Sequence, residues 1–250
     1  MMAIKGRKRS SAGRARSPAA RTEKSQRMNS SLTLKAYEEL KERIIVGYFL
    51  AGQYLKEGDI SSQLGLGRTP VHQALQRLHV EGLVEVVPRK GVIIQPDSIP
   101  QIMEILDARF IIESELAAGA AENGSKEEVS ELDRVLSGQG QPSGAGAIDA
   151  FIEVDRAFHA RIATMSRNKI LADFAKSLHE RSIRYWYLQM WQTMDTVSTQ
   201  REHRAILDAI RKGDRKGASR AMRAHIKSLR DRLAEIQSHG PRRHVSPALR

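Results

Sequence analysis

Residues 56–95, KEGDISSQLGLGRTPVHQALQRLHVEGLVEVVPRKGVIIQ, decide how the rest of the chain is interpreted. The pattern of apolar residues, glycines and β-branched residues divides this stretch into a helix, a turn, a second helix and two strands: 57–64, 65–67, 69–81, 83–87 and 91–95. Two helices at this spacing predict a helix-turn-helix, and the hairpin that follows predicts the wing of a winged helix.

The second helix of this stretch has two distinct faces. Its apolar residues recur at i, i+3, i+4 and i+7 and form one inward stripe: Val71, Ala74, Leu75 and Leu78. Arg68 at the helix entrance and a row of hydrogen-bonding side chains face outward: Thr69, His72, Gln73 and Gln76. A polar helix face fits the major groove of DNA, and the cations at the hairpin tip, Arg89 and Lys90, can reach the DNA backbone or the minor groove. These seven residues are the predicted DNA contacts; the alternative is an ordinary helical hairpin with a solvated polar face.

Several short sequence motifs of this region resemble those of the DNA-binding domain of GntR-type bacterial transcription regulators. They are GYFLAGQYL at 47–55, GRTPV at 67–71, ALQRL at 74–78 and EGLV at 81–84. The chain departs from the family pattern at Gly67, His72 and Gln73, where Ser or Thr, Arg and Glu are usual. These replacements remove a hydroxyl cap from the helix start and exchange a permanent cation for an imidazole that titrates near neutrality.

The composition limits the class of protein. The chain has 250 residues, no cysteine and a net charge of +12. Disulfides, thiolate metal sites and cysteine nucleophiles are therefore excluded, which suits a cytoplasmic protein. No apolar run approaches the roughly twenty residues of a membrane span, so no membrane partner is expected.

The positive charge is concentrated at the N-terminus. Residues 1–30 hold nine Lys and Arg and one Glu, a net of +8, which leaves +4 for the other 220 residues. Because this segment has few large apolar residues, we expect a disordered basic tail that attracts DNA phosphates non-specifically. A solubilising extension, or a start codon assigned too far upstream, explains the tail equally well.

The rest of the chain is expected to be mainly α-helical. A first helix at 32–46 completes a winged-helix domain at 31–95, two prolines mark a linker at 96–100, and an all-α domain at 101–237 precedes a flexible tail at 238–250. Six helices are expected to form a bundle: 100–122, 126–136, 147–165, 169–190, 197–212 and 214–237.

Four polar residues of the predicted bundle lie on apolar helix stripes. Asp155 and His159 share the stripe of the helix at 147–165, while His203 and His225 interrupt the stripes of the last two helices. A buried carboxylate is costly unless something satisfies it. One Asp and three His make a donor set for Zn²⁺ or Ni²⁺ with positions left for water or an anion. The alternative for each histidine is a core position bonded to a carbonyl.

Three further histidines are expected to have no such role. His179 lies at the edge of its stripe, and His239 and His244 lie in the polar C-terminal region. We interpret these three side chains as structural or solvated.

This second half resembles the FCD domain of the FadR-like branch of GntR regulators. The similar residues are Asp155 to His159, Asn168, Glu202-His203, Ile206, Ile210, Gly213-Asp214 and Ala221 to His225. The resemblance implies that Asp155, His159, His203 and His225 are metal ligands. It also implies that Arg109 and Asn168 contact an effector, although Arg109 could equally form an i+4 ion pair with Glu113.

Together these patterns predict a transcriptional regulator, a repressor by the family's commoner mode, that binds an operator in double-stranded DNA as a homodimer. A small carboxylate effector is expected to bind the metal and change the placement of the two DNA-binding heads. One alternative is a constitutive DNA-binding protein with a structural metal. The other is a metal-dependent hydrolase, which the absence of a His-Glu-x-x-His or Gly-x-Ser-x-Gly motif disfavours.

Overall fold

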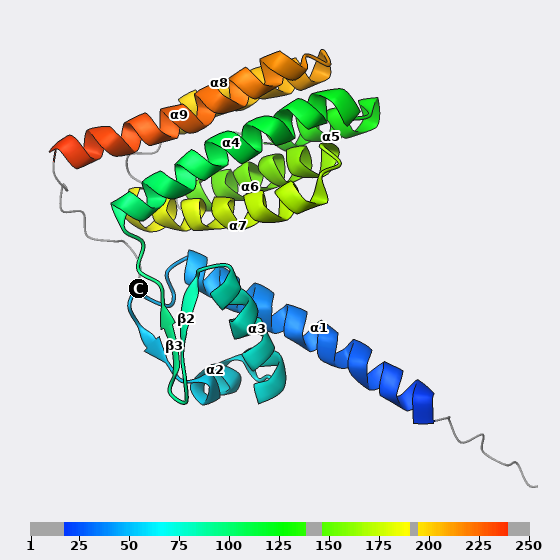
Figure 1. Cartoon of the computed structure of the whole chain (residues 1–250), viewed down its shortest axis with the longest axis vertical. Helices are drawn as coiled ribbons and strands as arrows, with labels where there is room; N and C mark the ends of the chain where they lie inside the picture. Colours follow the sequence, from blue (N-terminus) through cyan, green and yellow to red (C-terminus); the bar gives the residue numbers. More distant parts are fainter. Residues whose placement is uncertain (1–17, 139–146, 191–194, 240–250) are drawn as a thin grey trace, which may run out of the picture.

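The computed structural model describes residues 18–138, 147–190 and 195–239, which form a winged-helix half and a helical bundle joined by a short segment (Figure 1). The winged half contains three helices and three short strands: α1 (Pro18–Ile45), β1 (Tyr54–Leu55), α2 (Glu57–Leu64), α3 (Arg68–Val80), β2 (Val84–Val87) and β3 (Gly91–Ile94). The bundle contains α4 (Ile99–Asn123), α5 (Lys126–Ser137), α6 (Ala147–Met165), α7 (Lys169–Tyr185), the π-helical turn η1 (Trp186–Met190), α8 (Thr196–Arg211) and α9 (Arg215–His239).

The helix-turn-helix forms where the sequence predicts it. Gly65 ends α2 in the left-handed conformation, with φ of 62°, and its position starts the turn into α3. The inward face of α3 is buried as predicted: Val71, Ala74, Leu75 and Leu78. It shares one hydrophobic core with residues of α1: Ala36, Tyr37, Leu40 and Ile44. The outward face of α3 is thereby left to solvent.

The wing is a three-stranded antiparallel sheet in the order β1-β3-β2. Val84 pairs with Ile94 and Val87 with Gly91, so the predicted hairpin is confirmed. The short strand β1, which the periodicity does not predict, pairs with β3 on the other side. Gly91 is required here because a Cβ atom would lie 2.2 Å from the carbonyl oxygen of Leu55.

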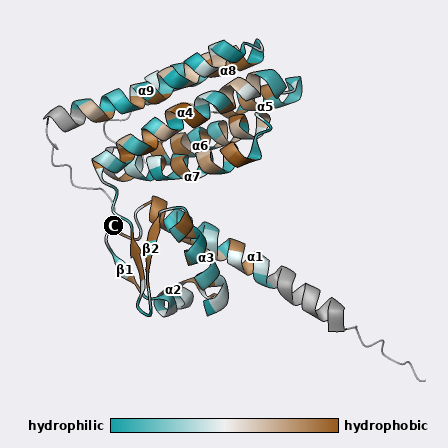
Figure 2. Cartoon of the chain, viewed as in Figure 1, coloured by the Kyte–Doolittle hydropathy of each residue, from teal (hydrophilic) through white to brown (hydrophobic). Residues whose placement is uncertain are grey.

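The bundle is built on α4, which packs against α6, α7, α8 and α9. Short polar residues cap the helix starts: the Ser98 hydroxyl accepts from the Gln101 amide, and Ser125 and Glu128 form a capping box. Each helix turns its apolar stripe inward, and hydrophobic and hydrophilic stretches alternate along the helices in Figure 2. Among the described residues no helix is both long enough and apolar enough to cross a membrane.

The two halves are in direct contact through α6 and α7. Phe151 and Ile152 of α6 and Ile183 of α7 belong to the same hydrophobic cluster as the core of the winged half. Arg184 of α7 donates to the carbonyl of Gln95 and pairs with Asp97, both in the connecting segment. In Figure 1, α7 is the bundle helix that faces the winged half.

Three expected boundaries are corrected. Residues 18–30 are not a disordered tail but the first turns of α1, because Ala, Glu, Lys, Arg and Gln extend a helix that tertiary packing has already nucleated. Ile99 and Pro100 belong to α4 rather than to the linker, since proline is tolerated in a first turn. Helix α9 continues to His239, two residues into the expected tail. Residues 1–17 and 240–250 of the expected tails lie outside the described part, as do residues 139–146 and 191–194.

Candidate metal centre and DNA-binding face

All seven predicted DNA contacts are exposed: Arg68, Thr69, His72, Gln73, Gln76, Arg89 and Lys90. The first five lie on the outward side of α3, beginning at its N-terminus. The last two lie in the β2–β3 turn, and the N-terminus of α3 and this turn are at the end of the winged half away from the bundle (Figure 1). A helix and a basic hairpin side by side suit simultaneous contact with a groove and the adjacent backbone.

Two of these side chains already have partners within the protein. His72 Nδ1 lies 3.0 Å from a carboxylate oxygen of Glu57 on α2, and the Thr33 hydroxyl of α1 lies 2.7 Å from Gln73 Oε1. Thr33 and Glu57 therefore border the DNA-binding face, which their positions in the sequence did not suggest. When His72 or Gln73 binds a base, the contact with Glu57 or Thr33 is replaced by the contact with the base.

A cluster of buried polar side chains occupies the centre of the bundle. Asp155 and His159 come from α6, His203 from α8 and His225 from α9, so the structure brings all four predicted ligands together. The three histidines are at most 6% exposed. Ring centroids are 5.4 Å apart for His159 and His203, 5.3 Å for His159 and His225, and 4.7 Å for His203 and His225.

The imidazole nitrogens of this cluster are largely without hydrogen-bond partners. Both nitrogens of His203 and Nε2 of His159 and His225 are buried and unpartnered within the described structure. Asp155 Oδ1 lies 3.4 Å from His203 Nε2 and 3.9 Å from His159 Nε2. Unsatisfied buried nitrogens are costly, and a group of them beside a carboxylate has the donor atoms to hold a metal ion.

Two carboxylates outside the predicted set orient the imidazoles from behind. Glu202 Oε2 lies 2.8 Å from His225 Nδ1 and leaves Nε2 facing the cluster. Glu113 Oε2 lies 2.6 Å from His159 Nδ1 as an ion-pair contact. Metal-binding histidines in proteins commonly have such a carboxylate on the second nitrogen. The sequence does not suggest this role for either glutamate, since Glu202 directly precedes His203 and Glu113 lies four residues after Arg109. Only the fold places the two carboxylates behind the imidazoles.

The charges of the cluster are coupled. Burial raises the pKa of the Asp155 carboxyl, but the hydrogen bond from His179 and the neighbouring imidazoles hold it well below its usual value. Burial likewise opposes ionisation of Glu113, and Arg109 and His159 outweigh it, so the pKa of Glu113 is well below its usual value. Burial and His225 hold the pKa of His203 well below its usual value. An ionised carboxylate and a neutral imidazole, the forms that these shifts favour for Asp155 and His203, are the forms that ligate a divalent ion.

His179 also lies in this cluster and is not solvated, so of its two interpretations only the structural one remains. Its side chain is buried, and Nε2 lies 2.9 Å from Asp155 Oδ2. Its ring centroid is 4.4 Å from that of His159. The edge of the α7 stripe is covered by α4 and α6 together, which a single-helix periodicity does not reveal.

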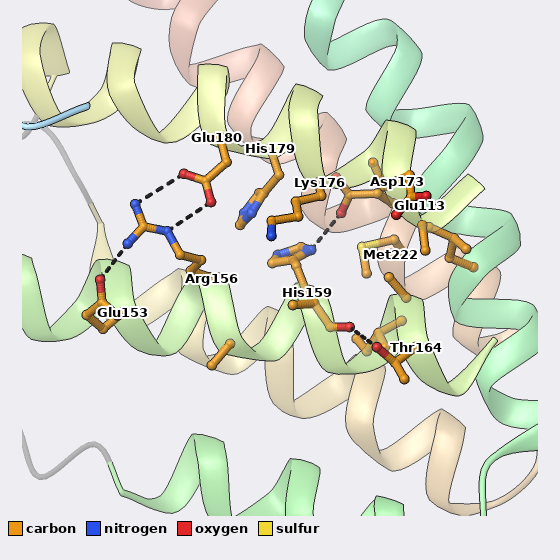
Figure 3. Close-up of a pocket in the computed structure, with 17 residues that line it drawn as sticks. Glu113, Glu153, Arg156, His159, Thr164, Asp173, Lys176, His179, Glu180 and Met222 are labelled. Carbon is orange, nitrogen blue, oxygen red and sulfur yellow. Dashed lines mark hydrogen bonds and ion pairs between the residues drawn. The ribbon is translucent and has the colours of Figure 1, made fainter. Parts of the chain in front are cut away.

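Two hollows flank the cluster. A pocket of about 450 Å³ lies between α6 and α7, and Glu113, His159 and His179 are on its wall, as Figure 3 shows. A smaller hollow of about 40 Å³ lies on the other side, against Asp155, His179 and His225. The first has room for a small organic molecule, and the second has room for a few water molecules.

The two residues that the resemblance implies for effector binding lie in different surroundings. Arg109 borders the small hollow, and its guanidinium is held by Glu113, at 2.5 Å, and by the Ser182 hydroxyl, at 2.9 Å. The i+4 ion pair is therefore what the structure contains. Asn168 is exposed, lines neither hollow and caps α7 by accepting from the Leu171 amide, so its place is that of a helix cap.

The chain matches two family models: "Bacterial regulatory proteins, gntR family" over residues 32–94 and "FCD domain" over residues 104–228. Together they cover both halves of the fold. The chain belongs to the GntR family of bacterial regulatory proteins and to its branch with an FCD domain.

Proteins similar to this chain are named as transcriptional regulators. The Uxu operon regulator of Haemophilus influenzae is 28% identical over 222 residues, 79% of this chain and 80% of that protein. The Nta operon transcriptional regulator of Aminobacter aminovorans is 28% identical over 189 residues, 76% of this chain and 88% of that protein. Among solved structures, E. coli McbR/YncC shares the fold with a TM-score of 0.71 at 24% identity, over 84% of this chain and 99% of that one. The protein is a DNA-binding transcriptional regulator and not an enzyme.

Proposed function

We propose that this regulator binds a divalent metal in its bundle and responds there to a small carboxylate effector that alters operator binding. The observation that carries the proposal is the convergence of unpartnered buried nitrogens of His159, His203 and His225 beside Asp155. No structural purpose is served by leaving these nitrogens unsatisfied in a core. A metal ion satisfies one nitrogen of each of the three imidazoles at once.

Zn²⁺ and Ni²⁺ fit this donor set best. Imidazole nitrogens and a carboxylate oxygen are ligands for late first-row divalent ions. A metal bound here supplies a Lewis acid to which an oxygen anion can bind. Glu202 and Glu113 orient His225 and His159, so the ligands need little rearrangement.

The pocket between α6 and α7 is the proposed effector site. It reaches the cluster through His159 and His179 and is large enough for a small acid. Arg109 serves this site indirectly, because its charge is paired with Glu113, the carboxylate behind His159.

The regulator is proposed to act as a homodimeric repressor. One winged helix presents a small surface, while two heads on paired half-sites match a two-fold operator. Repression is supported by the name of a relative, the "HTH-type transcriptional repressor RspR" of E. coli, which is 24% identical over 201 residues. An effector changes operator affinity only if it binds one arrangement of the heads better than the other.

The test combines metal analysis with DNA binding. Protein purified without chelator is expected to contain about one Zn or Ni per chain by plasma mass spectrometry and to sediment as a dimer. Genomic DNA fragments selected by the protein then provide the operator for anisotropy titrations against a panel of small carboxylates. At least one acid should shift both operator affinity and the melting temperature, and should do so only with metal present.

The alternative is a constitutive DNA-binding protein whose metal only braces the bundle. It predicts metal in the protein but no acid that changes either quantity. The pocket of about 450 Å³ beside two of the histidines favours the effector-responsive function, because a purely structural site is closed on all sides.

A further inference from the structure

His179 distinguishes this cluster from the four-residue set at its centre. The four predicted ligands come from α6, α8 and α9, whereas His179 comes from α7. We propose that His179 is a fifth protein ligand of the metal site, and that it clamps α7 to α6 beneath the DNA-binding half. This inference rests on the proposed metal function. It adds one ligand and a path by which metal binding reaches the DNA-binding half.

The donor atoms form two overlapping triads. His159, His203 and His225 have donor atoms within 4.8 Å of one another, and so do Asp155, His159 and His179. His159 belongs to both, and Asp155 Oδ2 lies 2.9 Å from His179 Nε2 while Oδ1 faces His203. One ion that meets the first triad and Asp155 therefore has His179 within a short side-chain movement. His179 also borders both hollows, so it stands where the cluster opens to the pocket.

The DNA-binding half rests on the two helices that His179 would join. From α6, Phe151 and Ile152 pack into the core of the winged half. From α7, Ile183 packs into the same core, and Arg184 holds the connecting segment through Gln95 and Asp97. His179 lies one to two turns from both α7 residues, about 7 Å along the helix axis for Arg184.

A second contact follows the same route. Arg156 of α6 pairs with Glu180 of α7 at 3.1 Å and lies 3.7 Å from Glu42 of α1. Figure 3 shows Arg156 and Glu180 beside His179. A bond from a metal to His179 therefore fixes the α6–α7 spacing at the level where both helices support α1. Ligands on α8 and α9 alone do not do this, because those helices lie away from the winged half (Figure 1).

The rival role for His179 is a hydrogen bond that only orients Asp155. Two substitutions separate the two roles. In His179→Gln the amide nitrogen can still donate to Asp155, but the side chain is a poor ligand. In His179→Leu both functions are lost while the volume is kept. Lys176→Gln is the matched control, because Lys176 lies one turn away on α7 and lines the same pocket.

The first measurement is metal binding by the full-length chain after chelator treatment. Titration with Co²⁺ reports affinity and, from the intensity of its visible bands, the coordination number, since the bands strengthen as ligands are lost. We expect His179→Gln and His179→Leu to bind Co²⁺ at least tenfold more weakly with stronger bands, and Lys176→Gln to match the unmodified chain. A wild-type spectrum and affinity in His179→Gln would show an orienting hydrogen bond and overturn the proposal.

The second measurement is amide hydrogen exchange with and without Zn²⁺. In the unmodified chain, metal should slow exchange in α6, α8 and α9 and also in residues 180–185 and 92–97. In His179→Gln the protection of 180–185 and 92–97 should be lost while that of α8 and α9 stays. If 180–185 and 92–97 remain protected in the variant, the clamp is disproved. If the unmodified chain binds neither metal, the metal function itself fails, a result seen without any variant.

Discussion

Arg184 of α7 and Asp97 of the connecting segment form an ion pair with an N–O distance of 2.8 Å, in which the arginine side chain is fully buried. Burial lowers the pKa of the Arg184 guanidinium although Asp97 opposes the shift. Burial also raises the pKa of the Asp97 carboxyl against the attraction of Arg184. Desolvation thus outweighs the attraction, and the pair sets the position of the connecting segment rather than adding to stability.

Breaking this pair on one side should be far more damaging than removing it. Arg184→Met or Asp97→Asn leaves a buried partner alone and should lower the free energy of unfolding by about 3–5 kcal/mol. The double variant should lose clearly less than the sum. Urea unfolding of all four proteins measures the coupling. The exposed pair of Arg215 and Glu122 is the control, with an expected effect of about 1 kcal/mol or less. Additive losses at 97 and 184 would refute a coupled pair.

Glu81 gives the DNA-binding half a defined acid sensitivity. Its carboxylate accepts from the Tyr37 hydroxyl at 2.8 Å and from Lys41 Nζ at 2.9 Å. Burial raises the pKa of Glu81, but the bonds from Lys41 and Tyr37 bring it below its ordinary value of 4.5. A lowered pKa in the folded state means that the stabilisation is present above pH 4.5 and is lost as the pH falls through the folded value.

The substitution Glu81→Gln should therefore be costly near neutrality and less costly in acid. The free-energy difference between the unmodified chain and the variant, from urea unfolding at several pH values between neutrality and acid, should shrink below pH 4.5. Glu85→Gln, at an exposed position of β2, is the control and should show a small difference at every pH. A difference for Glu81→Gln that does not change with pH would exclude this ionised network.

Substitution of Arg89 in the wing should have opposite effects on stability and on DNA binding. Its φ is 63°, in the left-handed region that glycine adopts without strain. Arg89→Gly should leave the free energy of unfolding unchanged or raise it by about 1 kcal/mol. DNA affinity should fall, and the slope of the logarithm of the binding constant against the logarithm of the salt concentration should become smaller by about one. Lys90→Gly, which removes a charge without a positive φ, should lower DNA affinity without the gain in stability. Equal DNA affinity in both variants and the unmodified chain would remove the wing from the interface.

Arg68 tests the base-reading end of α3. It is exposed in the first turn of this helix, whose start at Gly67 has no side-chain cap. Arg68→Ala should lower the free energy of specific operator binding by about 1–3 kcal/mol and change the sequence preference at one position. Footprints that do not change would place the base contact on another residue of the same face, and His72→Ala is the next variant to compare.

Local signals were sufficient for most of the architecture. The apolar stripe of α3, the strands flanking residues 88–90 and the start of α5 at Lys126 all follow from short-range rules of periodicity and capping. The grouping of Asp155 with three histidines was also predictable, because each residue interrupts an apolar stripe that must face the same core. The helices and the hairpin depend on contacts within one element, and the grouping of the four polar residues depends only on the apolar stripe that each one interrupts.

The features that the sequence did not reveal depend on contacts between elements. His179 lies at a stripe edge, and whether an edge is buried depends on which third helix covers it. Strand β1 has two residues and exists only because β3 offers an edge. Arg109 turns to Glu113 and Ser182 because Ser182 arrives from α7, 73 residues later in the chain. Periodicity in one element carries no information about such partners.

His203 provides the sharpest test of the metal centre. Its ring is fully buried, stacks on Phe158 with centroids 4.5 Å apart, and has no hydrogen-bond partner for either nitrogen in the described structure. An unsatisfied buried polar group lowers stability by about 1–3 kcal/mol. His203→Leu should therefore unfold at the same or a higher urea concentration than the unmodified chain when both are free of metal. This is the opposite of what a substitution in an optimised core does.

When Zn²⁺ is present, the unmodified chain should instead be the more stable of the two proteins. Zn²⁺ at about a hundred times its dissociation constant should raise the free energy of unfolding of the unmodified chain by about 2.7 kcal/mol, and should not change that of His203→Leu. Operator affinity without effector should be equal in the two proteins, because His203 lies in the bundle and not in the winged half. A metal-free His203→Leu that is several kcal/mol less stable, yet still stabilised by Zn²⁺, would show that His203 is an ordinary core residue.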